Sequence, residues 1–302
     1  MRGRFAPSPT GALHLGNLRT ALISWLQMRA ERGEWWVRSE DLDRITSSDE
    51  HARGQLADLA ALGMTPDGPV VRQSDRFDRY EAAIDELRRQ GRVYECFCTR
   101  REIREAAQAP HGELPDGAYA GTCRDLGAAD RARFVQEGRR PALRLRTDGE
   151  RFVVHDLVAG DYEGGVDDVV LRRNDGVPAY NLAVVVDDAA QGITHVVRGD
   201  DLLSSTPRQR LLQELLGLPE PVYAHVPLVL APDGTRLAKR HGAVTLADLA
   251  ARGVSAGQVL ARLGASLGLC APDDVVTAPD LAERFTMAAV PRAPWSLGEA
   301  DL

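Results

Sequence analysis

The 302-residue sequence predicts an α/β fold: a doubly wound parallel sheet of the Rossmann type, with an insertion and a short helical C-terminal region. Three observations support this prediction. Strand-like apolar runs alternate with helical patterns up to residue 93, a Gly/Pro-rich stretch flanked by cysteines then interrupts the alternation, and strand and helix patterns resume after residue 177. In such sheets, ligands bind beyond the carboxyl ends of the strands.

The first half of the sheet is expected from strands at 2–6, Glu34–Ser39, 70–73 and 93–97. Between them, apolar residues recur at helical spacing after residue 16 and along 77–90. Ser47 or Ser48 begins another helix, which Gly63 ends. The insertion shows short alternating runs at 142–145, 152–154 and 169–171.

The second half is expected to begin with a buried strand at 179–186, followed by a strand at 194–198. Thr206-Pro207 is typical of a helix start, and that helix should stop at Gly217. A last strand covers 225–230, a turn follows, and helical patterns fill most of the remainder. The predicted domains are 1–93 (catalytic, first half), 94–177 (insertion), 178–241 (catalytic, second half) and 242–302 (helical).

Composition narrows the class of protein. The net charge of −7 argues against a protein that clamps long nucleic acid non-specifically, because phosphate attraction needs positive surface. No apolar run reaches the ~20 residues of a membrane span, and no signal peptide precedes the first motif. Four cysteines in a chain of this size do not suggest a disulfide framework. We therefore expect a cytoplasmic enzyme that does not bind membranes, and a monomer.

Residues 4–16, RFAPSPTGALHLG, form the most informative motif. A strand that runs through a small-residue loop into a helix aims backbone N–H groups and the positive helix end at one point, where phosphate binds. Gly11 and Gly16 allow close approach of a ligand because they lack a Cβ, and His14 adds a hydrogen-bond donor or a cation. The alternative is an ordinary βα turn with a solvent-facing histidine.

This motif resembles the first signature of class I aminoacyl-tRNA synthetases, in the form of the glutamyl branch. The resemblance implies that Gly11, His14, Gly16 and Asn17 hold ATP, which carries Mg²⁺ with it. Asn17 stands where a second histidine is usual. Residues 236–240, RLAKR, resemble the lysine-bearing second signature of the same class; its five residues are Arg236, Leu237, Ala238, Lys239 and Arg240.

The implied catalytic residues are His14 and Lys239. When an amino-acid carboxylate attacks the α-phosphate of ATP, negative charge builds on the phosphates, and a cation there stabilises the transition state more than the ground state. Taken alone, RLAKR is more often a solvated basic turn after a strand; its position late in the sheet, together with the first signature, favours the catalytic interpretation.

A glutamate pocket needs a cation for the side-chain carboxylate and an acceptor for the ammonium group. The resemblance assigns Arg4 to the carboxylate and Glu40 to the ammonium group. It completes the pocket with Phe5, Ala6, Pro7, Ser8, Tyr180 and Arg198. The alternatives are an ion pair of Glu40 with Arg38 or Arg44, and core packing of Tyr180.

Cys96, Cys98 and Cys123 supply three thiolates where tetrahedral zinc takes four ligands. Tyr119 matches the fourth ligand of the glutamyl-Q tRNA(Asp) synthetase family, and His111 is the alternative on general chemistry. We expect one structural Zn²⁺ per chain, in a zinc-bearing insertion that a metal would stabilise. The alternative is a set of buried free cysteines; Cys270 is expected in the core.

Only about sixty residues follow Lys239, so no anticodon-binding domain is expected. The resemblance to the glutamyl-Q family implies that the enzyme activates L-glutamate with ATP without tRNA and transfers it to queuosine in the anticodon of tRNA(Asp). In that case the anticodon stem-loop would enter the site that otherwise receives an acceptor end. Three alternatives stay open: a short glutamyl-tRNA synthetase that charges tRNA(Glu), a non-catalytic tRNA-binding paralogue, and an adenylating enzyme for another acidic amino acid.

Overall fold

The computed structural model describes residues 1–99, 101–103, 118–231, 233–235, 237 and 245–298. Its central sheet has the order β3-β2-β1-β9-β10-β6-β7. All neighbouring strands are parallel except the β6–β7 hairpin. The strands are β1 (Arg2–Phe5), β2 (Glu34–Ser39), β3 (Val71–Arg72), β6 (Arg151–Asp156), β7 (Gly160–Gly165), β9 (His195–Gly199) and β10 (Val222–Val226).

Helices cover both faces of this sheet, as in the doubly wound fold that the sequence predicts. One face packs against α1 (Leu15–Ala30), and the other lies against α6 (Tyr180–Ala190) and α7 (Thr206–Leu216). Side chains alternate between the faces of a strand. Phe5, Val37 and Val197 belong to the apolar core around α1, so their neighbours along the strands point toward α6.

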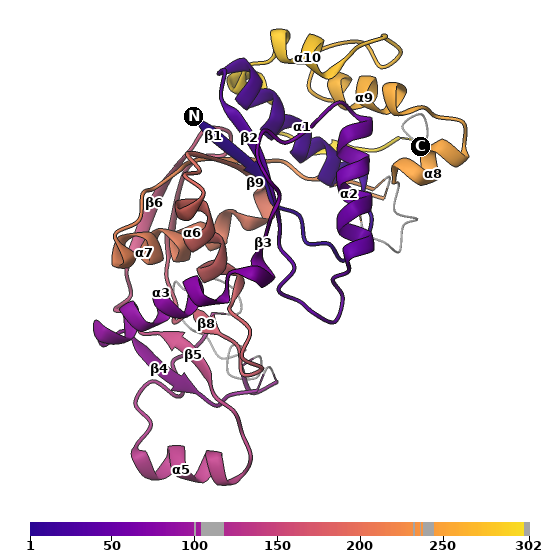
Figure 1. The fold of residues 1–302 in the computed structure, drawn as a ribbon. Helices are drawn as coiled ribbons and strands as arrows, with labels where there is room; N and C mark the ends of the chain where they lie inside the picture. The colour runs from indigo at the N-terminus through magenta and orange to yellow at the C-terminus, as the bar shows by residue number, and fades with distance from the viewer. Residues whose placement is uncertain (100, 104–117, 232, 236, 238–244, 299–302) are drawn as a thin grey trace.

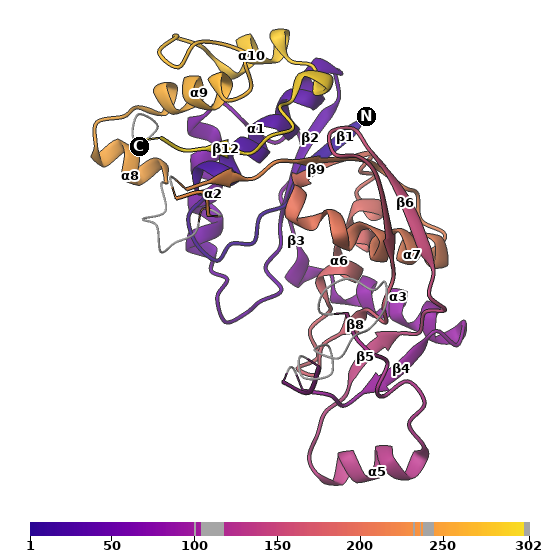
Figure 2. The same ribbon diagram turned by 180° about the vertical axis from the view of Figure 1, so that it is seen from behind.

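A smaller antiparallel sheet has the order β4-β5-β8. Its strands are β4 (Val93–Cys96), β5 (Ala142–Leu145) and β8 (Val170–Arg172), and α3 (Phe77–Arg89) precedes it in the chain. Apolar residues of this sheet share a core with α3, α6 and α7. Figures 1 and 2 show this sheet and α5 (Ala128–Gln136) at the end of the molecule opposite α8–α10.

The C-terminal elements pack on α1. They are the helices α8 (Leu246–Ala251), α9 (Ala256–Ala265) and α10 (Ala278–Arg284), and β12 (Trp295–Ser296), which pairs in parallel with β11 (Val229–Leu230). A capping box begins each of the three helices. None of the helices in the described part of the chain is long and apolar enough to cross a membrane.

Several predicted elements are confirmed with their boundaries. The strand at Glu34–Ser39 is β2. The helix expected from Ser47 or Ser48 is α2 (Asp49–Ala61), which Ser48 caps by accepting a hydrogen bond from the backbone of His51. The helix expected from Thr206 is α7, and Gly217 ends it in the left-handed conformation (φ 63°).

The strand expected at 179–186 is wrong, because this segment lies in α6. Leu182, Ala183, Val184 and Val185 are all buried, since α6 is packed between the sheet, α3 and α7. A helix that is buried on nearly all sides has a continuous run of apolar residues, without the 3.6-residue period of an amphipathic helix. Such a run cannot be told from a buried strand in the sequence.

Three other segments differ from expectation. The strand expected at 225–230 is two strands, β10 and β11, which separate at Pro227, a residue with no N–H for a ladder. The strand expected at 70–73 shortens to β3 and turns into a 3-10 helix, η1 (Gln73–Asp75). The β6–β7 hairpin lies within the range expected for the insertion, yet extends the central sheet.

Candidate active site

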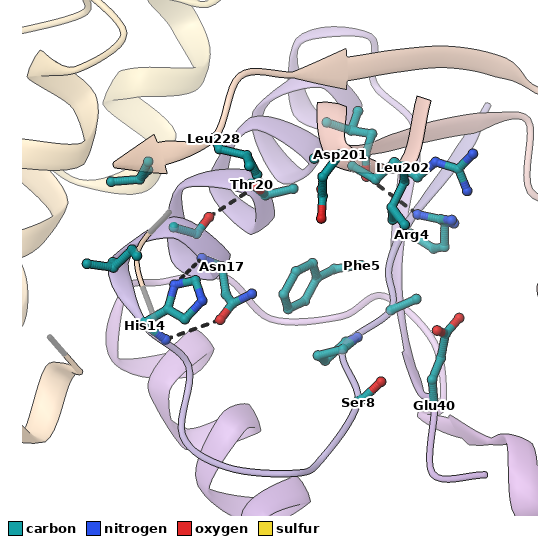
Figure 3. Close-up of a pocket in the computed structure, with 18 of the residues that line it drawn as sticks. Arg4, Phe5, Ser8, His14, Asn17, Thr20, Glu40, Asp201, Leu202 and Leu228 are labelled. Carbon is teal, nitrogen blue, oxygen red and sulfur yellow. Dashed lines mark hydrogen bonds between the residues drawn. The ribbon is translucent and has the colours of Figure 1, made fainter. Parts of the chain in front are cut away.

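A cavity of about 220 Å³ lies where β1 and β9 end and α1 begins (Figure 3). Residues predicted to hold glutamate and residues predicted to hold ATP line it together. They are Arg4, Phe5, Ala6, Pro7, Ser8, His14, Gly16, Asn17, Glu40, Tyr180 and Arg198. Leu237, predicted as part of the lysine-bearing signature, also lines it. Gly11 lines an adjoining cavity of about 400 Å³, which also reaches His14 and Asn17. Arg236, Ala238, Lys239 and Arg240 lie outside the described residues.

His14 is the N-cap of α1 and forms a reciprocal capping box with Asn17 (Figure 3). Its Nδ1 accepts from the backbone N–H of Asn17, and the side-chain oxygen of Asn17 accepts from the backbone N–H of His14, both at 3.3 Å. A Cβ at position 16 would lie 3.0 Å from the imidazole, so Gly16 makes room for the ring. Because Nδ1 is an acceptor, the neutral ring carries its proton on Nε2.

Arg4 and Arg38 occupy the α6 face of the sheet with buried carboxylates. Asp188 of α6 lies 3.3 Å from Arg4 Nε and 2.6 Å from Arg38 Nη1. Burial opposes ionisation of Asp188, but the two arginines outweigh it and lower the pKa of this carboxyl. Arg4 is therefore already paired with a carboxylate of the protein.

Glu40 accepts a hydrogen bond from Arg38 Nη2 at 3.0 Å, so the alternative ion pair with Arg38 is present in the structure. The same side chain lines the cavity. Burial raises the pKa of Glu40, and the attraction of Arg38 and Arg4 offsets this only in part. A cation entering the cavity would favour the ionised form of this carboxyl.

Arg198 is 5% exposed and has a different set of partners. Its Nε donates to His225 Nε2 and its Nη2 donates to Thr206 Oγ1, both at 2.9 Å, while Tyr180 Oη lies 3.5 Å from Nη1. Tyr180 is 37% exposed and lines the cavity, so core packing of this side chain is excluded. Thr206 begins α7 as expected, and its buried hydroxyl also accepts a hydrogen bond from Arg198.

Most of the residues that hold the predicted ones were not expected from the sequence. They are Asp156, Asp187, Asp188, Gln191 and His225, all buried. Arg38 was expected only as an alternative ion-pair partner of Glu40, and Thr206 only as a helix start. A signal was present, since charged residues interrupt or end apolar runs in EWWVRS, LAVVVDD and VYAHV. Charged side chains in such runs are rarely buried unless they are paired.

The thiol cluster (Cys96, Cys98 and Cys123) lies beside the smaller sheet. The three sulfur atoms lie within 4.8 Å of one another, and Tyr119 Oη lies 3.3 Å from Cys96 Sγ and 3.5 Å from Cys98 Sγ. The guanidinium of Arg144 stacks 3.7 Å from the centre of the Tyr119 ring. Three thiols at this spacing could hold a metal ion, and Tyr119 lies where a fourth ligand would stand. His111 lies outside the described residues, and Cys270 packs against the α1 core as expected.

The profile for the catalytic domain of class I tRNA synthetases (E and Q) matches residues 1–301. A glutamyl-Q tRNA(Asp) synthetase from Nocardia farcinica is 60% identical over 99% of this chain and 94% of its own length. The chain belongs to the glutamyl-Q tRNA(Asp) synthetase family. A second relative of that name, from Symbiobacterium thermophilum, is 46% identical over 97% of the chain.

Family membership agrees with the fold. A crystal structure of a glutamate tRNA ligase from Elizabethkingia meningosepticum, in complex with its amino acid, superposes with a TM-score of 0.83 and 26% identity. The match covers all of this chain and 68% of that one. This chain and that ligase therefore share one fold over the whole length of this chain.

Proposed function

We propose that this protein is a ligase that activates L-glutamate with ATP in the absence of tRNA and transfers the glutamyl group to queuosine in the anticodon of tRNA(Asp). The observation that carries the proposal is the 60% identity, over nearly the whole chain, to a relative named for that activity. The cavity supports the first half of the reaction, because cationic, anionic and phosphate-compatible groups line one space of about 220 Å³.

The first step joins the two small substrates. The α-carboxylate of glutamate attacks the α-phosphorus of ATP, the bond to the bridging oxygen breaks, and pyrophosphate leaves as glutamyl-adenylate forms. His14 and the start of α1 would receive ATP, Glu40 the ammonium group, and Arg198 with Arg4 the side-chain carboxylate. Mg²⁺ would accompany the phosphates and reduce their negative charge.

The second step consumes the adenylate. A hydroxyl of queuosine attacks the acyl carbon, the bond to the phosphate oxygen breaks, and AMP leaves with the bonding electron pair. The thiol cluster with Tyr119 would hold one structural Zn²⁺, whose contribution is to stabilise the fold around it.

Transfer of labelled glutamate tests the proposal. The pure enzyme should label tRNA(Asp) that carries queuosine, and should not label the same tRNA without queuosine or tRNA(Glu). Labelling of tRNA(Glu) instead would identify a short glutamyl-tRNA synthetase. ATP–pyrophosphate exchange without tRNA should require glutamate and reject aspartate. Absence of any exchange would favour a non-catalytic paralogue.

Lys239, which lies outside the described residues, is proposed to stabilise charge on the phosphates in the transition state. Lys239→Ala should lower the rate of glutamate activation about 10²- to 10³-fold while glutamate affinity changes little. Single-turnover adenylate formation and equilibrium glutamate binding measure the two effects separately. Equal losses in both would contradict a transition-state role.

A further inference from the structure

His225 lies on β10 directly opposite Arg198 on β9, and both side chains point to the α6 face of the sheet. His225 does not line the cavity, whereas Arg198 does. We propose that His225, held by Asp156, is a positioning residue that fixes the Arg198 guanidinium without neutralising it, so that Arg198 presents its full charge to the side-chain carboxylate of the amino acid. This inference rests on the proposed use of glutamate as substrate.

The hydrogen-bond partners of His225 determine which ring nitrogen carries the proton. An arginine side chain has donors only, so His225 Nε2 must be an acceptor where it lies 2.9 Å from Arg198 Nε. The ring proton of the neutral imidazole is then on Nδ1, which lies 2.6 Å from Asp156 Oδ2. The carboxylate of Asp156 also accepts from the backbone N–H groups of Val158, Ala159 and His225, at 2.8 to 3.0 Å. These bonds fix the carboxylate, which in turn fixes the imidazole.

A neutral acceptor at position 225 has an electrostatic consequence. Arg4 and Arg38 face the carboxylates of Asp188 and Glu40, which cancel much of their charge. Among its described hydrogen-bond partners, Arg198 meets an imidazole and two hydroxyl groups. A carboxylate at position 225 would hold the guanidinium equally well, but would compete with the carboxylate of the substrate for its charge.

The surroundings keep His225 neutral. Its side chain is fully buried against the Tyr223 ring, which stacks at 5.9 Å. Thr206 Oγ1 lies 3.2 Å from Nε2, and Arg198 and Arg4 are the cations that disfavour a second positive charge. Among the residues that the structure describes, Asp156 alone contacts it with a negative charge, and that bond uses Nδ1.

Two substitutions of His225 separate the bond to Arg198 from the bond to Asp156. In His225→Asn, the short amide can still donate to Asp156 but cannot reach Arg198. In His225→Gln, the longer amide can still accept from Arg198 but leaves the Asp156 contact. Titration calorimetry with L-glutamate should show affinity ten- to a hundredfold weaker in His225→Asn and much closer to the native value in His225→Gln. ATP affinity should be unchanged in both.

The amino-acid selectivity of the enzyme is a measurement that would not change if His225 had a purely structural role. The preference for L-glutamate over L-glutamine should narrow in His225→Asn, because a misplaced Arg198 loses more with a carboxylate than with an amide. Equal effects of the two variants on glutamate binding, or parallel losses for ATP and glutamate, would overturn the proposal.

Asp156→Asn is an independent test, should His225→Asn fail to fold. An amide nitrogen facing Nδ1 would favour the opposite tautomer, which turns a proton toward Arg198 Nε. Glutamate affinity should fall, although Asp156 does not line the cavity. Unchanged affinity would overturn the proposal, as would a native protein that does not bind glutamate. A native protein that binds glutamate but does not transfer it to queuosine would contradict the proposed function alone.

Discussion

The cavity and the thiol cluster are assembled in opposite ways. Around the cavity, Arg4 meets Asp188 across 184 positions of sequence, and His225 meets Asp156 across 69. In the thiol cluster, Cys96 and Tyr119 are 23 positions apart, and Cys98 and Cys123 are 25. The cavity therefore depends on closure of the whole central sheet. The four side chains of the cluster come from one stretch of chain and are held by the neighbouring Arg144 and Asp167. A substitution in the network around the cavity should therefore lower the stability of the whole protein, whereas a substitution in the thiol cluster should have a local effect.

The largest effect is expected from Asp188→Asn, which removes the carboxylate shared by Arg4 and Arg38. Loss of one partner from a buried ionic network leaves charges uncompensated and costs about 3–5 kcal/mol. Urea unfolding should show this decrease in the free energy of unfolding. Glu81→Gln, in a partly exposed pair with Arg172, is the matched control and should cost at most about 1 kcal/mol. Similar losses in both would show that the buried Asp188 network contributes no more to stability than a partly exposed ion pair.

Arg198→Ala should mainly affect binding. A hydrogen bond to a charged group contributes about 1.5–3 kcal/mol, so glutamate affinity should fall roughly ten- to 150-fold. Arg198→Lys keeps the charge but loses the forked geometry, and should recover only part of the loss. Calorimetry with L-glutamate provides the measurement, and unaltered affinity in Arg198→Ala would show that Arg4 recognises the carboxylate instead.

Cys98→Ser tests the local character of the thiol cluster. The bound zinc per chain should fall, and the segment around Tyr119 should become more open to protease, while measurable ATP–pyrophosphate exchange remains. Cys270→Ser is the control, because Cys270 packs near α10 and should leave the metal content unchanged. Native metal content in Cys98→Ser would exclude zinc at this cluster.

The smallest effect concerns pH. Burial, with some help from Arg198, lowers the pKa of His225 below its ordinary value of 6.5. Below pH 6.5 the unfolded chain therefore binds a proton that the folded protein does not, and stability falls as the pH falls, by at most about 1.4 kcal/mol per pH unit. The stability difference between the native protein and His225→Gln should shrink from pH 7 to 5.5. A constant difference would contradict a neutral, buried His225.

The sequence predicted the parts of the molecule that depend on local signals. Ser48 and Gly217 mark helix ends because capping and left-handed backbone act within a few residues. The spacing in Cys96-x-Cys98 likewise pointed to the thiol cluster. Resemblance to the family, in its signature motifs and in its glutamate pocket, supplied many of the residues that line the cavity, and their individual roles stay predictions.

Contacts between residues far apart in the sequence could not be predicted from local patterns. Asp188 lies at the end of an apolar run that reads as a strand, and only the position of α6 over the sheet shows that it faces Arg4 and Arg38. In the same way, the contact between His225 and Arg198 depends on the register of β9 and β10, which the sequence alone does not show. The pairing of β11 with β12 could not be read from two residues with no alternating pattern.

That last pairing bears on how the protein is made. Val229, which lines the cavity, lies in the strand that Trp295 pairs with, and β1 pairs with β9 almost 200 positions later. During synthesis, β1 can therefore pair with β9 only after residues near 195 have been made. The strand that contains Val229 can pair with β12 only after residues near 295 have been made. A nascent chain therefore carries the signature residues long before the strands that complete the cavity have been made.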